Sequence, residues 1–363
     1  MENLIDKLKN NPLHYMSLGS KELFHSNFWA WLIDYDKRFV ECFFPGFDVN
    51  NINRVAREEG KRDITIWTKD NKAYVIENKF KSIPTFEQLE NYQNKLGVLF
   101  EQGILTGIYD NGVLSKVNSG KWRFLSYKEI AGKIRRILKS TENDKDTFEY
   151  RLIDKYIDYL QDLDDILTDY LMQYQKELIQ SSSLEFNKME DLKLGDLCKK
   201  LNMQMFLKDI NSIDISSQLD LKDIVWEADT DFTRKESLIS CRLKVKDIDN
   251  YTTLEIGVQL QGNQYRRFFS KCSPSIEKTD NDLDIRFLIE NNWFGNVFED
   301  KTLFGHPTVL KSSYNTYYEQ NKYIMRYQYW FIDNYSFEHL KNEIFKDMKF
   351  ALEILKNYKA SRY

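Results

Sequence analysis

The sequence Lys61-Arg-Asp-Ile-Thr-Ile-Trp67, followed by Ala73-Tyr-Val-Ile-Glu-Asn-Lys79, decides the fold of the first half of the chain. Each of these segments holds an apolar run, and the residues between them, 69–72, have the composition of a turn, which predicts a β-hairpin. In a hairpin the start of the first strand meets the end of the second. We therefore expect Asp63 to lie beside Glu77, although 14 positions (77 − 63) separate them along the chain.

The second strand ends in two charged residues, Glu77 and Lys79, with one residue between them. Side chains alternate across a strand, so both are expected on one face. Burying a carboxylate or an ammonium group is costly without compensation. Together with Asp63 they would suit a hard cation such as Mg²⁺ or Mn²⁺. The alternative is an ordinary salt bridge between Glu77 and Lys79 on a solvated edge strand, and the spacing alone allows both.

The ordered set of Asp63, a hairpin and Glu77-Asn78-Lys79 resembles the PD-(D/E)xK nuclease superfamily. The following Gln88-x-x-x-Tyr92 resembles the extra motif of its RecB-like and lambda-exonuclease-like branches. The chain departs from the pattern in one place, because Arg62 rather than proline precedes Asp63.

An upstream segment extends the resemblance. The helix expected over 21–33 contains Glu22-Leu-Phe-His-Ser26-Asn-Phe-Trp-Ala-Trp-Leu, similar to the first helix of bacterial PD-(D/E)xK families found in phage defence. The resemblance covers the chain up to about residue 140. It implies a restriction-endonuclease-like α/β core, in which a central mixed sheet is flanked by helices.

The resemblance also implies a chemistry, that of a Mg²⁺-dependent deoxyribonuclease, a hydrolase of phosphodiester bonds. Asp63, Glu77 and the backbone carbonyl of Asn78 would hold the metal ion, Mg²⁺ or Mn²⁺. Lys79 would orient or deprotonate a water molecule and stabilise developing charge. Gln88 would support the site, and Glu22 would be the additional acid.

Simpler explanations exist for the two supporting residues. Glu22 lies in the first turn of its helix, where the helix dipole favours an acid. Thr85-x-x-Gln88 is a capping-box pattern, and Tyr92 is explained by a place in the core. Both explanations remain open from the sequence.

The remaining pattern of the first half predicts alternating helices and strands. The residues at 36–52 read as a loop, and the other expected elements are strands at 53–58, 103–109 and 122–125 and helices at 85–100 and 126–138. A nuclease-like domain is expected at 1–180, including a trailing helix over 148–179.

A second domain is expected at 181–363, after a serine linker at 181–183. It reads as an α+β domain with an antiparallel sheet that binds the substrate or a protein partner. Its expected elements are helical segments over 189–213, strands at 237–245, 252–260, 264–269, 284–289, 304–309 and 323–332, and a closing helix over 337–358. Tyr265-Arg-Arg-Phe-Phe269 and the tyrosines between 314 and 329 could stack on bases, or could be a plain sheet face and core.

Composition excludes several classes of protein. The chain has 363 residues, a net charge of −4, four scattered cysteines and four histidines, which disfavours a zinc site, a disulfide framework and a broad basic surface for DNA. No apolar run approaches the roughly 18 residues that a membrane helix needs, and no signal peptide is seen, so a cytoplasmic protein without a membrane partner is expected.

Two functions follow from the sequence. The first is a metal-dependent endonuclease that binds and cuts DNA, in antiviral defence against phage or in DNA processing. The alternative is a catalytically silent nuclease-fold module that binds protein or nucleic acid. The acidic net charge favours the silent module. The intact set of Asp63, Glu77 and Lys79 favours the nuclease.

Overall fold

The computed structural model describes residues 2–18, 21–80, 85–110, 112–117, 120–140, 145–174, 184–212, 224–233, 236–246, 253–261, 264–272, 286–294, 310–314, 323–331 and 337–362. The chain divides into two compact units, Met1–Gln173 with Asn187–Leu201, and Tyr174–Phe186 with Asn202–Tyr363. The expected boundary after residue 180 and the expected serine linker lie outside the described residues. Residues 187–201 belong to the first unit, whereas the sequence assigned them to the second domain.

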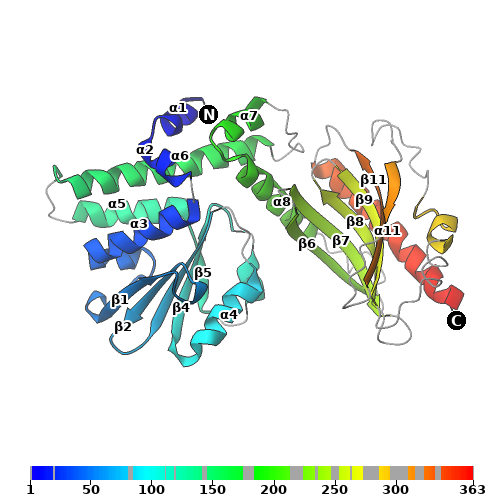
Figure 1. The fold of residues 1–363 in the computed structure, drawn as a ribbon, viewed down its shortest axis with the longest axis horizontal. Coiled ribbons are helices and arrows are strands. Elements are labelled where there is room, and N and C mark those ends of the chain that lie inside the picture. The colour runs from blue at the N-terminus through cyan, green and yellow to red at the C-terminus, as the bar shows by residue number, and fades with distance from the viewer. Residues whose placement is uncertain are drawn as a thin grey trace. The chain divides into compact units, whose positions relative to one another are not determined.

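The first unit is built on a five-stranded mixed sheet in chain order (Figure 1). The strands are β1 (Ile52–Arg57), β2 (Ile64–Thr68), β3 (Ala73–Lys79), β4 (Phe100–Gly107) and β5 (Trp122–Ser126). Strands β1 to β3 form an antiparallel meander, and β4 and β5 continue the sheet in parallel with β3. The expected mixed sheet flanked by helices is confirmed.

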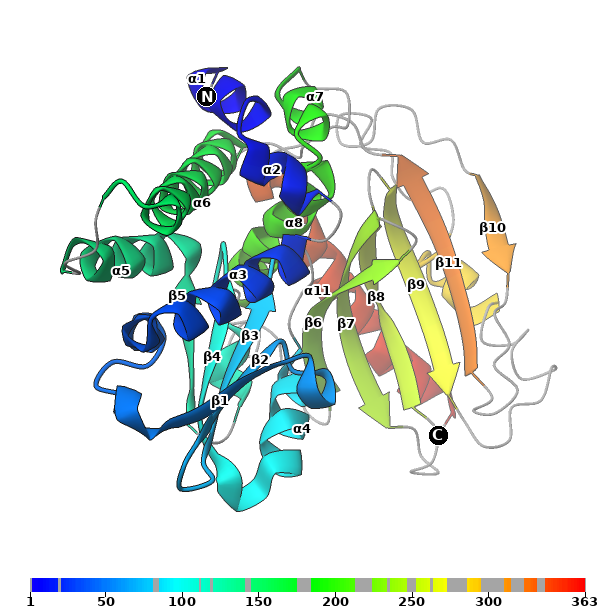
Figure 2. The same cartoon turned by 60° about the vertical axis from the view of Figure 1, so that its left-hand side comes forward.

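Helices cover both faces of this sheet. On one face, α4 (Phe86–Leu96) packs Leu89, Tyr92 and Leu96 into a core shared with Val75 and Leu105. On the other face lie α3 (Lys21–Tyr35) and α5 (Tyr127–Ser140), as Figure 2 shows for α3. The unit also contains α1 (Glu2–Lys9), α2 (Pro12–Ser17) and all but the last residue of α6 (Phe148–Tyr174). Two helices are divided between the units: α7 (Leu184–Asp191) begins in the second unit and ends in the first, and α8 (Gly195–Asn211) begins in the first and ends in the second.

Two expectations for the first unit are corrected. The expected loop at 36–52 contains two short 3-10 helices, Lys37–Cys42 and Val49–Asn51, because the side chains of Asp36 and Asp48 cap them. The helix expected to reach residue 100 ends at Leu96, since Gly97 adopts a φ of 55° that an L side chain rarely takes. Short 3-10 turns also occur at Glu59–Lys61, Gly97–Leu99 and Val113–Lys116.

The hairpin of β2 and β3 has the expected register. Ile64 pairs with Ile76 and Trp67 pairs with Ala73. The turn contains Asp70 and Asn71, and Asn71 lies in the left-handed region at φ 61°. One step beyond the Ile64–Ile76 pair, Asp63 reaches the level of Glu77 and Asn78.

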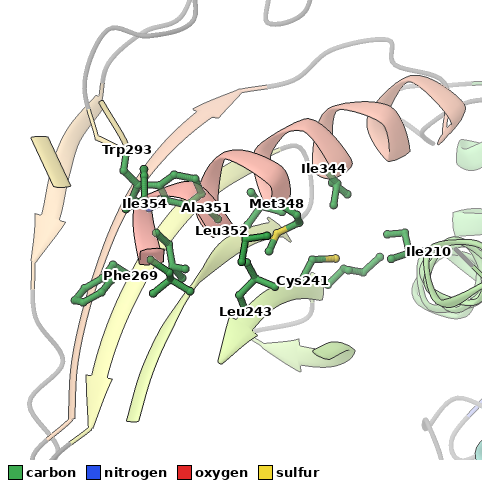
Figure 3. Close-up of a cluster of buried hydrophobic side chains, with 14 of the residues drawn as sticks. Ile210, Cys241, Leu243, Phe269, Trp293, Ile344, Met348, Ala351, Leu352 and Ile354 are labelled. Atoms are coloured by element: carbon green, nitrogen blue, oxygen red, sulfur yellow. The ribbon is translucent and has the colours of Figure 1, made fainter. Parts of the chain in front are cut away.

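The second unit is an antiparallel six-stranded sheet with the order β10-β11-β9-β8-β7-β6. The strands are β6 (Ile224–Thr233), β7 (Glu236–Lys246), β8 (Thr253–Gln261), β9 (Gln264–Cys272), β10 (Leu310–Tyr314) and β11 (Tyr323–Phe331). Helix α11 (Phe337–Arg362) packs Ile344, Met348 and Leu352 against Cys241 and Leu243 of the sheet (Figure 3). This agrees with the expected α+β architecture.

Three expectations for this unit need correction or comment. Residues 286–290 are helical, not a strand, because Leu288 and Trp293 must both enter the core while Ile289 stays exposed. Strand β6 was not expected, since Glu227 and Asp229 make its sequence polar; both pair with Arg242 on β7. The strand expected at 304–309 lies outside the described residues, and β10 follows directly after it.

None of the described helices combines the length and the apolar character that crossing a lipid bilayer requires.

Candidate active site

The open end of the β2–β3 hairpin brings Asp63 against the end of β3. The backbone N–H of Asn78 donates a 2.7 Å hydrogen bond to Oδ2 of Asp63. Strand β2 starts only at Ile64. The N–H of Asn78 therefore bonds to the Asp63 carboxylate instead of to a backbone carbonyl of β2. The turn before it is fixed by a backbone bond from Glu58 to the carbonyl of Asp63, at 3.1 Å.

Glu77 lies beside this carboxylate on the α4 face of the sheet and is 1% exposed. Its Oε1 accepts hydrogen bonds from Nζ of Lys79 at 2.8 Å and from Nε2 of Gln88 at 2.9 Å. Its Oε2 is buried and has no hydrogen-bond partner among the described residues. Buried polar atoms normally have a hydrogen-bond partner, so an ion or an ordered water would satisfy this oxygen.

Gln88 and Tyr92 connect Glu77 to the turn before Asp63. Nε2 of Gln88 also donates to the Tyr92 hydroxyl at 2.7 Å, and that hydroxyl donates to the carbonyl of Lys61 at 2.5 Å. The Thr85 side chain caps α4 by accepting from the backbone N–H of Gln88 at 3.3 Å. The capping contact expected from the sequence is therefore present, and the side chain of Gln88 is in addition bonded to Glu77, while its support of a reaction stays a prediction.

Glu22 reaches the same sheet end from α3. Its Oε1 accepts a 3.1 Å hydrogen bond from the backbone N–H of Phe80, the residue after Lys79. Its charge also acts on Asp63, Glu77 and Lys79. The structure thus brings Glu22, Asp63, Glu77, Lys79 and Gln88 together, although their separation in sequence spans 66 positions (88 − 22).

The electrostatics of the site are those of crowded negative charge. Burial, followed by repulsion from Glu77, raises the pKa of Asp63 to about 7. Burial also raises the pKa of Glu77, against the opposing effect of Lys79. Burial acts to lower the pKa of Lys79, but attraction to Glu77 and Asp63 outweighs it and raises the pKa. Lys79 is therefore a cation at neutral pH, and the carboxyl groups are short of positive charge.

These residues fit a divalent cation. A residue in a strand directs its N–H and its carbonyl to the same side, and the Asn78 N–H points at Asp63, so the Asn78 carbonyl leaves the strand toward that carboxylate. Asp63, Glu77 and this carbonyl offer the oxygen ligands that Mg²⁺ and Mn²⁺ prefer. Within the described ranges no group of three or more His, Cys, Asp and Glu side chains is arranged to hold a metal, so the fit depends on two carboxylates and a backbone oxygen.

The sequence missed the role of the Asn78 side chain. This side chain lies on the opposite face of the sheet from Glu77. It bonds to the backbone carbonyl of Glu22 and to the side chains of Ser26, Thr106 and Tyr127, which belong to α3, β4 and α5. No local pattern could have shown these contacts, because the partners lie 28 to 56 positions away.

The basic and aromatic segment Tyr265–Phe269 lies largely in the core, with Arg266 half-buried. Tyr265, Arg267 and Phe269 are buried in the core of the second unit, and Arg267 forms an ion pair with Asp347. Only the core explanation of this segment is correct. The expected tyrosine surface falls on side chains outside the described residues.

Comparison with known proteins identifies no relative: no protein-family model, no curated protein and no solved structure matches the chain.

Proposed function

We propose that the chain is a metal-dependent nuclease that hydrolyses phosphodiester bonds of DNA, on a restriction-endonuclease-like core. One observation carries the proposal: the buried Glu77 and the half-buried Asp63 lie together with raised pKa values, and the ammonium of Lys79, paired with Glu77, is the cation that acts on both. Strongly perturbed groups that also have a charge partner are typical of functional sites. A structural ion pair needs one carboxyl group for its cation, whereas this group has two carboxyl groups beside one ammonium.

In this proposal Asp63, Glu77 and the carbonyl of Asn78 hold Mg²⁺ or Mn²⁺. The bound ion supplies a lowered pKa for a coordinated water and offsets charge on the phosphate. Gln88 holds Glu77 in place, and Tyr92 ties Gln88 to the Lys61 turn, so both carboxylates keep a fixed geometry before substrate binds.

Lys79 acts as a fixed positive charge. Its raised pKa keeps it protonated at neutral pH, so it orients a water and stabilises negative charge that develops on the phosphate oxygens. Its side chain is 13% exposed, which leaves it a path to a substrate while its low-dielectric surroundings strengthen its field. This favours the electrostatic role over proton abstraction.

The test is cleavage of supercoiled plasmid and of linear single-stranded and double-stranded DNA with Mg²⁺ and with Mn²⁺. We expect Asp63→Asn and Lys79→Ala to lower cleavage at least about 1,000-fold, as loss of groups that stabilise transition-state charge does. The same hairpin offers matched controls, since Asp70→Asn and Lys72→Ala make equivalent changes at its far end.

The controls should cut within about twofold of wild type, because Asp70 and Lys72 lie outside the proposed machinery. Equal cleavage by Lys79→Ala and wild type would refute the proposal. Absence of cleavage by the wild-type chain with either metal on every substrate would favour the catalytically silent module. We further propose that the second unit selects the DNA or a protein partner, in phage defence or DNA processing.

A further inference from the structure

The side-chain amide of Asn78 lies beneath the carboxylates, on the opposite face of the sheet. It is completely buried and makes four hydrogen bonds. Nδ2 donates to the carbonyl of Glu22 at 2.8 Å and to Oγ of Ser26 at 3.3 Å. Oδ1 accepts from the hydroxyl of Tyr127 at 2.6 Å and from Oγ1 of Thr106 at 3.0 Å. These bonds use the full capacity of an amide.

The orientation of this amide is determined by its partners. The carbonyl of Glu22 can only accept, so the amide nitrogen must face it. Oγ of Ser26 donates its own proton to the same carbonyl at 2.9 Å, which leaves it free to accept from Asn78. Tyr127 and Thr106 then supply the donors on the other side. The network joins α3, β3, β4 and α5 at a single residue.

The consequence concerns Glu22. Its carbonyl is held by Asn78 and Ser26, and its carboxylate extends to the backbone N–H of Phe80, beyond the end of β3. We propose that the Asn78 side chain is a positioning residue that fixes this turn of α3 against β3, and thereby holds the Glu22 carboxylate at the end of β3, near Asp63 and Glu77 but outside the set of metal ligands. This inference rests on the proposed metal site.

The electrostatics agree with a third carboxylate near the pair. After burial and repulsion from Glu77, the charge of Glu22 adds to the rise in the pKa of Asp63. It also strengthens the attraction that raises the pKa of Lys79, after the larger effect of Glu77. A further negative charge near the pair favours the binding of a divalent cation, and Lys79 is the cation that these effects involve.

The experiment is calorimetric titration of the full metal-free chain with Mn²⁺, so the readout does not depend on cleavage. Outer residues that orient metal ligands typically change affinity by 10- to 100-fold. We expect Glu22→Gln to weaken Mn²⁺ binding about 30-fold and Asn78→Ala about tenfold. If Asn78 acts through Glu22, the double variant should bind within about twofold of Glu22→Gln alone.

Thr68→Val is the matched control, because Thr68 is a buried hydrogen-bonding residue at the far end of the same hairpin. It should lower the melting temperature without changing Mn²⁺ affinity by more than about twofold. If Asn78→Ala has wild-type affinity and only a lower melting temperature, the positioning role is wrong. Losses that multiply in the double variant would also overturn it.

A milder variant covers the case in which Asn78→Ala does not fold. Tyr127→Phe removes one hydroxyl and leaves Thr106 on the amide, so we expect Mn²⁺ binding about two- to threefold weaker, and no further loss in the Glu22→Gln background. Unchanged affinity would contradict the inference. If the wild-type chain binds Mn²⁺ and the variants lose affinity as expected, but no DNA is cut, the proposed nuclease activity is wrong and the positioning role of Asn78 is kept. If the wild-type chain binds no Mn²⁺, both proposals are wrong.

Discussion

Each compact unit holds a group of buried or half-buried charged side chains, and the two groups differ in the ratio of cations to anions. In the second unit, Arg267 meets Asp347 through two bonds, from Nε at 3.0 Å and from Nη2 at 2.6 Å. Tyr265 donates to the same carboxylate at 2.8 Å, and the guanidinium lies over the Trp293 ring at 4.9 Å. Here one cation faces one anion, and both the guanidinium and the carboxylate have further partners in the core.

The first unit does the reverse. Asp63 and Glu77 share Lys79, Glu22 adds a further carboxylate, and Oε2 of Glu77 has no hydrogen-bond partner among the described residues. A buried ion pair with one cation and one anion needs no ligand to offset its charge, so its role is in the folded structure. Carboxyl groups in excess of their cations are stabilised by an added proton or cation, which is the property that the proposed metal site would use.

The largest expected effect breaks the balanced pair. Arg267→Ala should lower the free energy of unfolding by about 3–5 kcal/mol, because it leaves the Asp347 carboxylate buried without its cation. Urea unfolding followed by tryptophan fluorescence measures the loss, since the guanidinium stacks on Trp293.

The control for this pair removes both charges. Arg267→Met with Asp347→Leu should recover at least about half of the loss, because no unpaired charge remains. A loss below about 1 kcal/mol in Arg267→Ala would show that the pair is not structural.

The second prediction removes one charge from the unbalanced group. Asp63 has a folded pKa of about 7 against an ordinary value of 3.8, so its contribution to stability is full below pH 3.8 and is lost as pH rises through 7. In the metal-free chain Asp63→Asn should therefore raise the free energy of unfolding by about 2–4 kcal/mol above pH 7. The gain should shrink toward zero near pH 4.

Urea unfolding at several pH values in the presence of a chelator measures this gain. Asp70→Asn is the control, because Asp70 is exposed at the far end of the hairpin. If Asp63→Asn were destabilising at pH 8, the site would not hold excess negative charge, and its contrast with the second unit would disappear.

The smallest effect separates the two roles of Gln88. Thr85→Ala removes the cap of α4 and should cost about 1 kcal/mol of unfolding free energy, with cleavage within about twofold of wild type. Gln88→Ala keeps the cap and should lower cleavage about tenfold, because it removes one of the hydrogen bonds that hold the Glu77 carboxylate. Cleavage rates and urea unfolding on both variants give the comparison. Parallel losses of activity and stability in both would mean that Gln88 has one role.

The sequence predicts those features that a short stretch of chain determines. Strand β3 was expected at its observed bounds, because the polar residues around Asp70 and Asn71 stand between two apolar runs. The hairpin alone then sets Asp63 opposite Glu77. The helical spacing of Gln88 and Tyr92 likewise puts both on one side of α4.

Long-range partners could not be predicted. The Asn78 amide and the Arg267–Asp347 pair connect residues 28 to 80 positions apart. The residues that flank Asn78 in the sequence give no indication of which distant residues its side chain contacts. The segment 284–289 shows the other limit. Its short apolar run fits a strand and a helical turn equally well, and only the burial of Leu288 and Trp293 decides between them.

The turn at Asp70 and Asn71 has a practical consequence. It lies at the far end of β2 and β3 from the carboxylates, and the pairs from Ile64–Ile76 to Trp67–Ala73 separate the two. Lengthening a surface connection costs little free energy as long as the flanking pairs are kept. A fluorophore or affinity tag inserted at this tip would therefore leave the pairs of the hairpin and the carboxylates at its other end in place.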